Sequence, residues 1–318
     1  MTKFVNFLAG MYKKVYNIAM RCLFLYNPQS GKGKLARKLD YIEKKLKTRY
    51  DDVQICATES SVELERRAAE AEGFDAVIFA GGDGTFNNVL CGLEGRQIQL
   101  GYLPAGTVND VARSLGIPRS VKGALKVILK GHSQELDCMR VGERKAMYVV
   151  AAGAFTSATY NTPQAQKRTF GALAYAFEGI RHHLKLTVFP VKVTSGGETV
   201  ETNAVLVLVL NGKSVAGFPV NRRGSMADGM LETIIIKQVL KPNLLRRLGA
   251  LFSVAFFFVF HGRIRKKDII RLRGESVEVQ TEPSVIWDFD GEEGFCGNAK
   301  IEVCPRRVKL FVPKKKKI

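Results

Sequence analysis

The amino-acid sequence predicts an α/β domain with a mostly parallel sheet, followed by a second domain built mainly from antiparallel strands. Three observations carry this prediction. The chain has 318 residues, enough for two domains at roughly 150 residues each. Between residues 21 and 130, short strand-like runs alternate with helical stretches, which is typical of a parallel sheet covered by helices. From about residue 135 the runs become longer, alternating and β-branched, which is typical of antiparallel sheets.

The expected elements follow from these runs. In the first domain we expect strands at 22–26, 53–58, 76–80 and 99–103, with helices near 34–49, 61–72, 86–94, 108–115 and 121–130. In the second domain we expect strands at 145–152, 186–194, 204–210, 231–237, 269–273, 277–281 and 300–303, with one helix at 168–183.

The expected domain boundaries follow from the same change in sequence pattern near residue 135. It comprises an amphipathic extension at 1–20, an α/β domain at 21–134, a β-rich domain at 135–312 and a basic tail at 313–318. A return of the last strand to the first domain is left open. Since there is neither an internal repeat nor a long linker, we expect the two domains to pack with a cleft between them.

Composition limits the classes of protein to consider. With 46% hydrophobic residues, the chain is neither a disordered tail nor a fibrous repeat. Its formal net charge of +19 indicates a polyanionic partner, such as nucleic acid, an anionic membrane or a phosphorylated substrate. The 6 cysteines include no CxxC pair and the 4 histidines are scattered, so neither a zinc site nor a disulfide framework is indicated. We therefore expect a reduced, intracellular protein.

Three segments bear on membrane contact. Apolar residues of the N-terminal stretch recur at helical spacing, which predicts a helix packed on its own domain or an interfacial membrane helix, with disorder as the remaining alternative. The apolar run at 248–260 would form roughly 20 Å of helix, too short for a bilayer core of about 30 Å. It is interpreted as a buried helix, or as one that enters a single leaflet or lines a lipid pocket. The terminal lysine run is either solvated or attracted to an anionic leaflet.

A glycine-rich loop after the third strand carries the strongest chemical signal. In the segment Gly81-Gly82-Asp83-Gly84-Thr85, glycines allow the backbone to approach a phosphate, and the following helix N-terminus favours an anion. Asp83 could hold Mg²⁺ against polyphosphate oxygens, or could simply cap the helix.

Two further loops follow other predicted strands of the same domain. Residues 27–34 form a polar loop that does not match the Walker A pattern and could be an ordinary turn. Residues 103–110 form another, which could be a helix cap. Because ligands of open α/β sheets bind at the carboxyl ends of strands, the three loops together predict an anion site better than any one of them alone.

Two acidic turns lie in the second domain. The turn at 225–231 could bind a cation through Asp228 and main-chain carbonyls, or could be a plain β-turn. The stretch at 287–293 holds four carboxylates, Asp288, Asp290, Glu292 and Glu293. Such crowding favours metal binding or a carboxyl group suited to accept a proton from an alcohol, although a solvated acidic turn is the alternative.

These motifs together resemble the diacylglycerol kinase catalytic family, which also contains sphingosine and ceramide kinases. The matching segments are Asn27-Pro28-x-Ser30-Gly31, Gly81-Gly82-Asp83-Gly84-Thr85, Leu103-Pro104-x-Gly106-Thr107-x-Asn109-Asp110, Asp228-Gly229-x-Leu231 and Asp290-Gly291-Glu292. They occur in the family's order and cover residues from about 21 to 312. The glycine motif alone is less specific, because NAD kinases and phosphofructokinases have similar loops.

The resemblance implies a nucleotide-binding α/β domain, a C-terminal β-sandwich and catalysis in the cleft between them. The residues it implies for ATP binding are Asn27, Pro28, Gln29, Ser30, Gly31, Thr58, Gly81, Gly82, Asp83, Gly84, Thr85, Phe86, Asn87, Thr107 and Asp110. Asp83 and Asp110 would lie near the phosphates and the catalytic Mg²⁺. A structural Mg²⁺ would be held by Asp228 with main-chain oxygens of Ser225 and Met230.

Glu292 matches the family's general base, with Asp290 the next candidate. The chain departs from the family at two positions. Val111 replaces a usual aromatic residue, and Ala227 replaces an acid often found before the Asp-Gly pair, which weakens the structural Mg²⁺ assignment.

We therefore expect an ATP- and Mg²⁺-dependent lipid kinase, cytoplasmic and peripheral on the inner face of the cell membrane. Diacylglycerol is the favoured acceptor; the alternatives are a sphingoid base, ceramide, a polyprenol or, in an NAD kinase-like enzyme, NAD. A nucleic-acid partner is not expected, because no RRM, KH, helix-turn-helix or C₂H₂ signature is present. A non-enzymatic relative is disfavoured because the key polar residues are present, and a homodimer is left open.

Overall fold

The computed structural model describes residues 19–28, 35–153, 188–238, 254, 257–260, 262 and 268–314. Several expectations therefore lie outside the described residues. They are the N-terminal amphipathic helix up to residue 18, Gln29, Ser30 and Gly31 of the first loop, the helix at 168–183, much of the apolar run at 248–260, and the end of the lysine tail.

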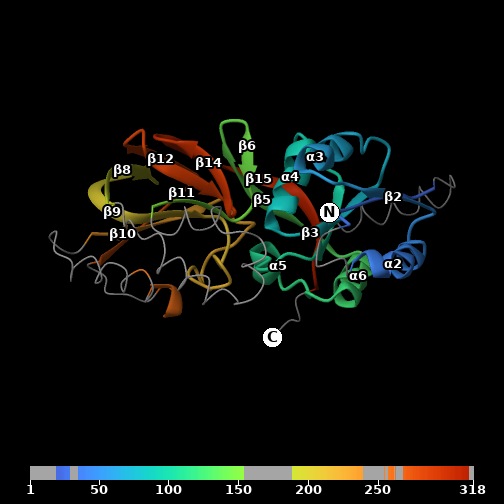
Figure 1. The fold of residues 1–318 in the computed structure, drawn as a ribbon. Coiled ribbons are helices and arrows are strands. Elements are labelled where there is room, and N and C mark those ends of the chain that lie inside the picture. The colour runs from blue at the N-terminus through green and yellow to red at the C-terminus, as the bar shows by residue number, and fades with distance from the viewer. Residues whose placement is uncertain are drawn as a thin grey trace.

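The first domain contains a parallel sheet in the order β2-β1-β3-β4. Its strands are β1 (Arg21–Tyr26), β2 (Asp52–Ala57), β3 (Ala76–Gly81) and β4 (Gln99–Pro104). All six residues of β3 are buried, as expected for the central strand of a sheet covered on both faces. The helices α3 (Ser61–Ala69) and α4 (Asp83–Gly92) cover one face, while α2 (Leu39–Leu46) and α6 (Val121–Lys130) lie on the other (Figure 1).

Local signals set the helix limits. The Ser60 side chain accepts a hydrogen bond from the Glu63 N–H at 3.1 Å and so starts α3. Gly131, in the left-handed region, ends α6. The helix expected at 86–94 begins earlier, at Asp83, because the extended Gly82 is its N-cap residue. A short turn, η2 (Ala36–Lys38), precedes α2, and α5 (Asp110–Leu115) follows β4.

The second domain is antiparallel, as predicted. Its strands are β5 (Ser133–Val141), β6 (Arg144–Ala146), β7 (Val149–Gly153), β8 (Phe189–Ser195), β9 (Glu198–Leu210), β10 (Leu231–Lys237), β11 (Ile269–Gly274), β12 (Ser276–Thr281), β13 (Ile286–Phe289), β14 (Glu292–Cys296) and β15 (Ala299–Phe311). The strand expected at 145–152 is two strands, interrupted at Met147 and Tyr148. The sequence analysis missed β5 and the β13–β14 hairpin, because polar and acidic residues interrupt their apolar patterns.

The last strand joins the two sheets. At its start β15 pairs with β12, along its length it pairs with β5, and near its end Lys309 and Leu310 lie parallel to Gln99 and Leu100 of β4. The described strands thus form one continuous hydrogen-bonded network from β2 to the β13–β14 hairpin.

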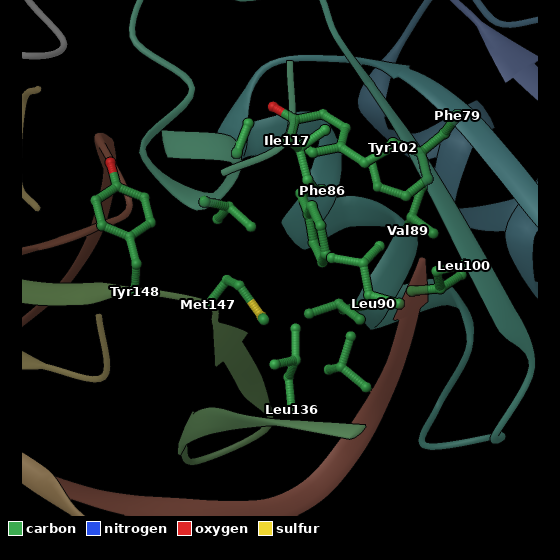
Figure 2. Close-up of a cluster of buried hydrophobic side chains, with 14 of the residues drawn as sticks. Phe79, Phe86, Val89, Leu90, Leu100, Tyr102, Ile117, Leu136, Met147 and Tyr148 are labelled. Atoms are coloured by element: carbon green, nitrogen blue, oxygen red, sulfur yellow. The ribbon is translucent and has the colours of Figure 1, made fainter. Parts of the chain in front are cut away.

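Two hydrophobic clusters stabilise this arrangement. The first has Phe79, Phe86 and Tyr102 near its centre, with ring centroids 5.0–5.3 Å apart, and reaches Met147 and Tyr148 of the second domain (Figure 2). The other fills the space between the antiparallel strands and includes fully buried Trp287. Each fully buried large apolar side chain contributes about 1.5–3 kcal/mol.

Among the described helices, none has both the length and the apolar character needed to cross a bilayer.

Candidate active site

The carboxyl ends of the first-domain strands share one edge of the sheet. In the parallel register Tyr26 lies beside Ala57 and Ala80, and Gly81 lies beside Pro104. The structure therefore brings together the described parts of the three predicted loops. Thr58, the first residue after β2, donates its N–H and its hydroxyl to the Tyr26 carbonyl, at 2.8 and 3.3 Å. Its side chain is buried and joins the ends of β1 and β2.

The glycine loop and the 103–110 loop pack backbone against backbone. The Gly81 carbonyl accepts hydrogen bonds from Ala105 N–H at 2.7 Å and Gly106 N–H at 3.2 Å. A Cβ atom on Gly106 would lie only 2.6 Å from the Gly82 Cα atom. The close approach therefore requires glycine at 106 and leaves both loops without side chains at their point of contact.

Asn109 fixes this second loop, and the sequence analysis gave it no role. Its backbone is left-handed, with φ of 56°, a conformation that asparagine tolerates better than most residues. Its Oδ1 atom accepts hydrogen bonds from Gly106 N–H at 2.9 Å and from the Tyr102 hydroxyl at 3.1 Å, while Nδ2 donates to the Gly106 carbonyl at 2.7 Å. These bonds hold the loop that carries Thr107, whose side chain is exposed.

Asp83 lies at the base of the site and is only 8% exposed. Its carboxylate accepts the N–H groups of Asp110 at 2.9 Å and Val111 at 3.2 Å, the first two residues of α5. Burial, and then the nearby charge of Asp110, raise the pKa of Asp83 to about 7. Asp83 thus connects the glycine loop to α5. Because it is buried, its carboxyl group is a weaker acid than an exposed aspartate.

Asp110 links the first domain to the second. Its side chain is fully buried, and Oδ1 accepts the N–H of Gly217 at 2.9 Å. Gly217 belongs to the loop between β9 and β10, and Ser214 of the same loop also hydrogen-bonds the Asp110 side chain. Burial raises the pKa of Asp110 despite these bonds. No sequence signal marks residues 214–217 as partners of a distant helix, so this contact is visible only in the structure.

Glu292 reaches the glycine loop from the other domain. It is the first residue of β14, and its carboxylate lies against Gly84, so closely that a Cβ atom on Gly84 would overlap Oε1. Gly84 is in the first turn of α4, where the helix dipole favours a negative charge. The structure therefore places the predicted base candidate directly beside the predicted phosphate loop.

Asp290 holds the hairpin that presents Glu292. It is 5% exposed and left-handed, with φ of 51°. Its carboxylate accepts N–H groups of Met147, Tyr148 and Val149 at 2.5–3.0 Å, and Asn87 of α4 hydrogen-bonds the same group. Burial outweighs these bonds and raises the pKa of Asp290 to about 7. Because its oxygens are aimed at backbone amides, Asp290 is a positioning residue in this geometry.

The side chains that follow the glycines of this motif pack inside the protein. The Phe86 ring is fully buried and packs edge-on against Phe79 and Tyr102, so only its backbone can face a ligand (Figure 2). Thr85 is half-buried, and its side chain fills the space where a Cβ on Gly81 would lie. Of the first loop, Asn27 and Pro28 follow β1 at the same edge and are half-buried.

The turn at 225–231 brings its predicted ligands together, but its carboxylate is already paired with the guanidinium of Arg273. Asp228 Oδ2 accepts a hydrogen bond from Arg273 Nη2 at 2.9 Å, and Arg273 Nε lies 3.5 Å from Glu232. Within the turn, Ser225 Oγ accepts the Ala227 N–H and Asp228 Oδ1 accepts the Met230 N–H, both at 3.3 Å. Ala227 supplies no carboxylate, and Asp228 is paired with Arg273. These residues therefore do not fit a resident Mg²⁺. No cluster of three or more His, Cys, Asp or Glu suited to a metal occurs in the described part of the chain.

Comparison with known proteins covers both domains. A family model described as "Diacylglycerol kinase catalytic domain" matches residues 21–141, and one described as "YegS C-terminal NAD kinase beta sandwich-like domain" matches residues 148–312. Curated diacylglycerol kinases from Staphylococcus aureus, strains bovine RF122 / ET3-1 and MRSA252, are each 30% identical to the chain over 299 residues. The matched region covers 92% of this chain and 92% of each relative.

Solved structures with a similar fold carry related descriptions. A protein from Bacillus anthracis strain Sterne, described as a candidate diacylglycerol kinase, matches with a TM-score of 0.80 at 26% identity, over 93% of this chain and 96% of its own. A second structure with the same description has a TM-score of 0.78 at 25% identity, over 93% of this chain and 98% of its own.

These matches run through both domains and confirm the resemblance on which the expected fold and the kinase assignment rested. The glycine loop and the Glu292 hairpin lie within the two matched segments, one in each. The chain therefore belongs to the diacylglycerol kinase catalytic family and is a lipid kinase.

Proposed function

We propose that the protein transfers the γ-phosphate of ATP, accompanied by Mg²⁺, to the hydroxyl of a membrane lipid, with diacylglycerol as the favoured acceptor and phosphatidate as the product. The observation that supports this most directly is the contact between Glu292 and Gly84. It joins a carboxylate that can accept a proton to the helix N-terminus that can receive a phosphate. The names of the curated relatives favour diacylglycerol over the other acceptors.

In the proposed reaction, Glu292 accepts the proton of the lipid hydroxyl as its oxygen attacks the γ-phosphorus. The new phosphate ester bond forms as the bond to the β-phosphate oxygen breaks, and ADP leaves. Backbone N–H groups of the loop at 81–85 and the N-terminus of α4 stabilise the charge on the transferred group. Catalysis then depends mainly on positioning, which Asp290, Asn87 and Asn109 provide through their hydrogen bonds.

The carboxylates of Asp83 and Asp110 suit the Mg²⁺ that arrives with ATP. The Asp83 oxygens each accept one backbone N–H, and a carboxylate oxygen has two acceptor sites. Each therefore retains capacity for a second partner. Both groups are close to the glycine loop, so a divalent ion bound there would also offset the charges that burial disfavours. The remaining predicted ATP contacts, including Thr58 and Thr107, stay predictions.

The test is phosphate transfer from labelled ATP to diacylglycerol, sphingosine, ceramide, undecaprenol and NAD, with the lipids in mixed micelles. We expect labelled phosphatidate, and we expect Glu292→Gln to lower kcat by about 10²–10⁴-fold with little change in ATP affinity. The matched control is Glu293→Gln, because Glu293 is the exposed neighbour on the same strand. Label on another lipid would change the acceptor. Full activity of Glu292→Gln would remove Glu292 from the mechanism.

We also propose that the enzyme works as a peripheral protein on an anionic membrane surface. The net charge of +19, with 12 Lys and Arg but 2 acidic residues among positions 1–49, supports this. Binding to phosphatidylglycerol vesicles, followed by sedimentation, should weaken with added salt and on removal of residues 1–20. Equal sedimentation of the full and shortened chains would assign the binding to another part of the molecule.

A further inference from the structure

Two cysteines that are far apart in the sequence face each other in the sheet. Cys138 of β5 and Cys304 of β15 are directly opposite in the antiparallel register. Opposed residues of antiparallel strands have Cα separations of about 4.5–5.5 Å, within the range of about 4.4–6.8 Å that disulfides require. Both cysteines are free, and their opposed places in the register bring their backbones within the range that disulfides require.

The two thiols differ in their surroundings. Cys138 is 1% exposed, and its hydrogen bond to Cys304 and its burial raise its pKa. For Cys304, the hydrogen bond from Cys138 and the charges of Arg140, Arg307 and Lys145 outweigh partial burial and lower its pKa to about 6. At neutral pH Cys304 is therefore mostly thiolate and Cys138 is a thiol. A nucleophilic thiolate beside a protonated partner is the arrangement of a reactive cysteine and its resolving cysteine.

A cavity of about 390 Å³ gives access to this pair. Both cysteines line it, with apolar walls from the end of α4 and basic side chains at Arg140, Lys145 and Arg307. Lys145 donates to the Leu90 carbonyl at 3.2 Å, and Arg140 pairs with Glu302 at 2.6 Å, so two of the three basic groups are held in place. The cavity is separate from the glycine loop, and its lining includes none of the residues assigned to ATP.

We propose that Cys304 is a peroxide-reactive cysteine that forms a reversible disulfide with Cys138. The Cys304 thiolate attacks one oxygen of hydrogen peroxide, the O–O bond breaks, and a sulfenic acid forms with release of hydroxide. The Cys138 sulfur then attacks the sulfenic sulfur, its proton and the sulfenic oxygen leave as water, and the S–S bond closes. The two thiols are oxidised by two electrons and the peroxide is reduced to two waters. A dithiol reductant returns both thiols by exchange.

Such a bond would cross-link β5 to β15 at the place where the second domain meets the first. Next to the pair, Asp137 accepts the N–H of Gly229 at 2.7 Å and of Arg306 at 2.9 Å, which ties both strands to the turn at 225–231. The bond would therefore form next to the irregular stretch of the β5–β15 pairing that follows Cys304, which these hydrogen bonds of Asp137 hold in place.

The first test measures the alkylation rate of each cysteine in the unmodified full chain, by iodoacetamide and peptide mass spectrometry across a pH series. The matched comparison is Cys296, which is exposed, so accessibility alone favours it. The lowered pKa of Cys304, about 6, makes a large fraction of its sulfur a thiolate at pH 6, and the thiolate is the form that reacts with iodoacetamide. We therefore expect Cys304 to react severalfold faster than Cys296 at pH 6. Equal or faster reaction of Cys296 would overturn the proposal.

The second test treats the chain with hydrogen peroxide and maps the products. We expect a Cys138–Cys304 cross-linked peptide in the unmodified chain and in Cys296→Ser, and none in Cys304→Ser. In Cys138→Ala, dimedone should trap a sulfenic acid on Cys304. Should the buried Cys138→Ala variant fail to fold, Arg307→Gln serves instead, because loss of one positive charge should slow both alkylation and cross-linking severalfold. Cross-links through other cysteines, or unchanged rates in Arg307→Gln, would contradict the assignment.

Discussion

At Gly84, the first turn of α4 faces the carboxylate of Glu292, and the absence of a side chain makes room for that carboxylate. Its backbone is helical, without a positive φ, so alanine suits the conformation and would add up to about 1 kcal/mol of helix stability. The added methyl group would displace the flexible end of Glu292. We expect Gly84→Ala to keep or raise the melting temperature while lowering kcat about 100-fold.

The measurement combines thermal unfolding with the lipid phosphorylation assay. Because stability and activity are expected to move in opposite directions, general damage to the fold is readily distinguished from displacement of Glu292. Full turnover in Gly84→Ala would show that the position of Glu292 against Gly84 is not needed for catalysis.

The two buried carboxyls also make stability depend on pH. Burial raises the pKa of Asp83 and of Asp290 to about 7, whereas an unfolded aspartate has a pKa near 3.9. Between about pH 4 and 7 the folded state therefore binds more protons than the unfolded state, and the free energy of unfolding should fall as pH rises. We expect a decrease on the order of a few kcal/mol across this range.

Urea unfolding of the wild type and Asp290→Asn at several pH values checks this expectation. Other titrating groups are common to both proteins, so the difference between their two profiles isolates Asp290. The asparagine variant should show a shallower decrease. Profiles that run parallel from pH 4 to 7 would mean that Asp290 ionises at its ordinary pKa in the folded protein.

At the scale of elements, the sequence predicted the first domain well because β1 and β3 are apolar runs, the first followed by Asn27 and the second ending at Gly81 and Gly82. It also predicted that the loops of β1, β3 and β4 would meet, since parallel strands share an edge. It could not predict β5 or the β13–β14 hairpin, where buried acidic residues accept hydrogen bonds from backbone amides of distant turns. In the sequence Asp290 is the second candidate for the general base, and only its three amide partners show that it holds the hairpin in place.

The same limit applies to contacts between elements. The functional motifs identify Glu292 and Gly84 but not their contact, and nothing near Asn109 in the sequence shows that it joins Tyr102 to Gly106. The pairing of Cys138 with Cys304 depends on the register of β5 against β15, which a pattern of scattered cysteines does not contain. These parts of the site become visible only with the tertiary structure.

The pairing of β10 with β11 leads to a prediction about the turn at 225–231. Arg273 lies directly opposite Glu232 in the register and pairs with Asp228, so a guanidinium already neutralises both carboxylates. We expect millimolar Mg²⁺ to leave the wild-type melting temperature unchanged. Arg273→Met should melt a few degrees lower and recover with Mg²⁺, because Asp228 and Glu232 would then lose the guanidinium that pairs with both of them.

Arg273→Lys is the matched control, since it keeps a positive charge at the same position and should stay insensitive to Mg²⁺. A wild-type melting temperature that rises with Mg²⁺, and no longer does so in Asp228→Asn, would instead support the structural Mg²⁺ site that the family resemblance implies.

At the scale of the whole molecule, the two matched segments are not independent sheets. The strand β15 comes from the C-terminal segment, yet it pairs with β5 along most of its length and with β4 at its end. Leu136 of β5 and Val308, Leu310 and Phe311 of β15 are all buried in the first core. The first domain thus depends on the last strand of the chain for one edge of its sheet.

This dependence predicts that residues 21–141 alone will not fold, because β4 and β5 would expose unpaired edges and apolar side chains. The same fragment extended by a flexible linker and residues 299–312 should fold, since β15 is then supplied within one chain. Far-ultraviolet circular dichroism with urea unfolding distinguishes the two, and only the extended fragment should show a cooperative transition. A cooperative transition in residues 21–141 alone would show that the parallel sheet and its helices are sufficient, and that β15 serves to attach the second domain rather than to complete the first.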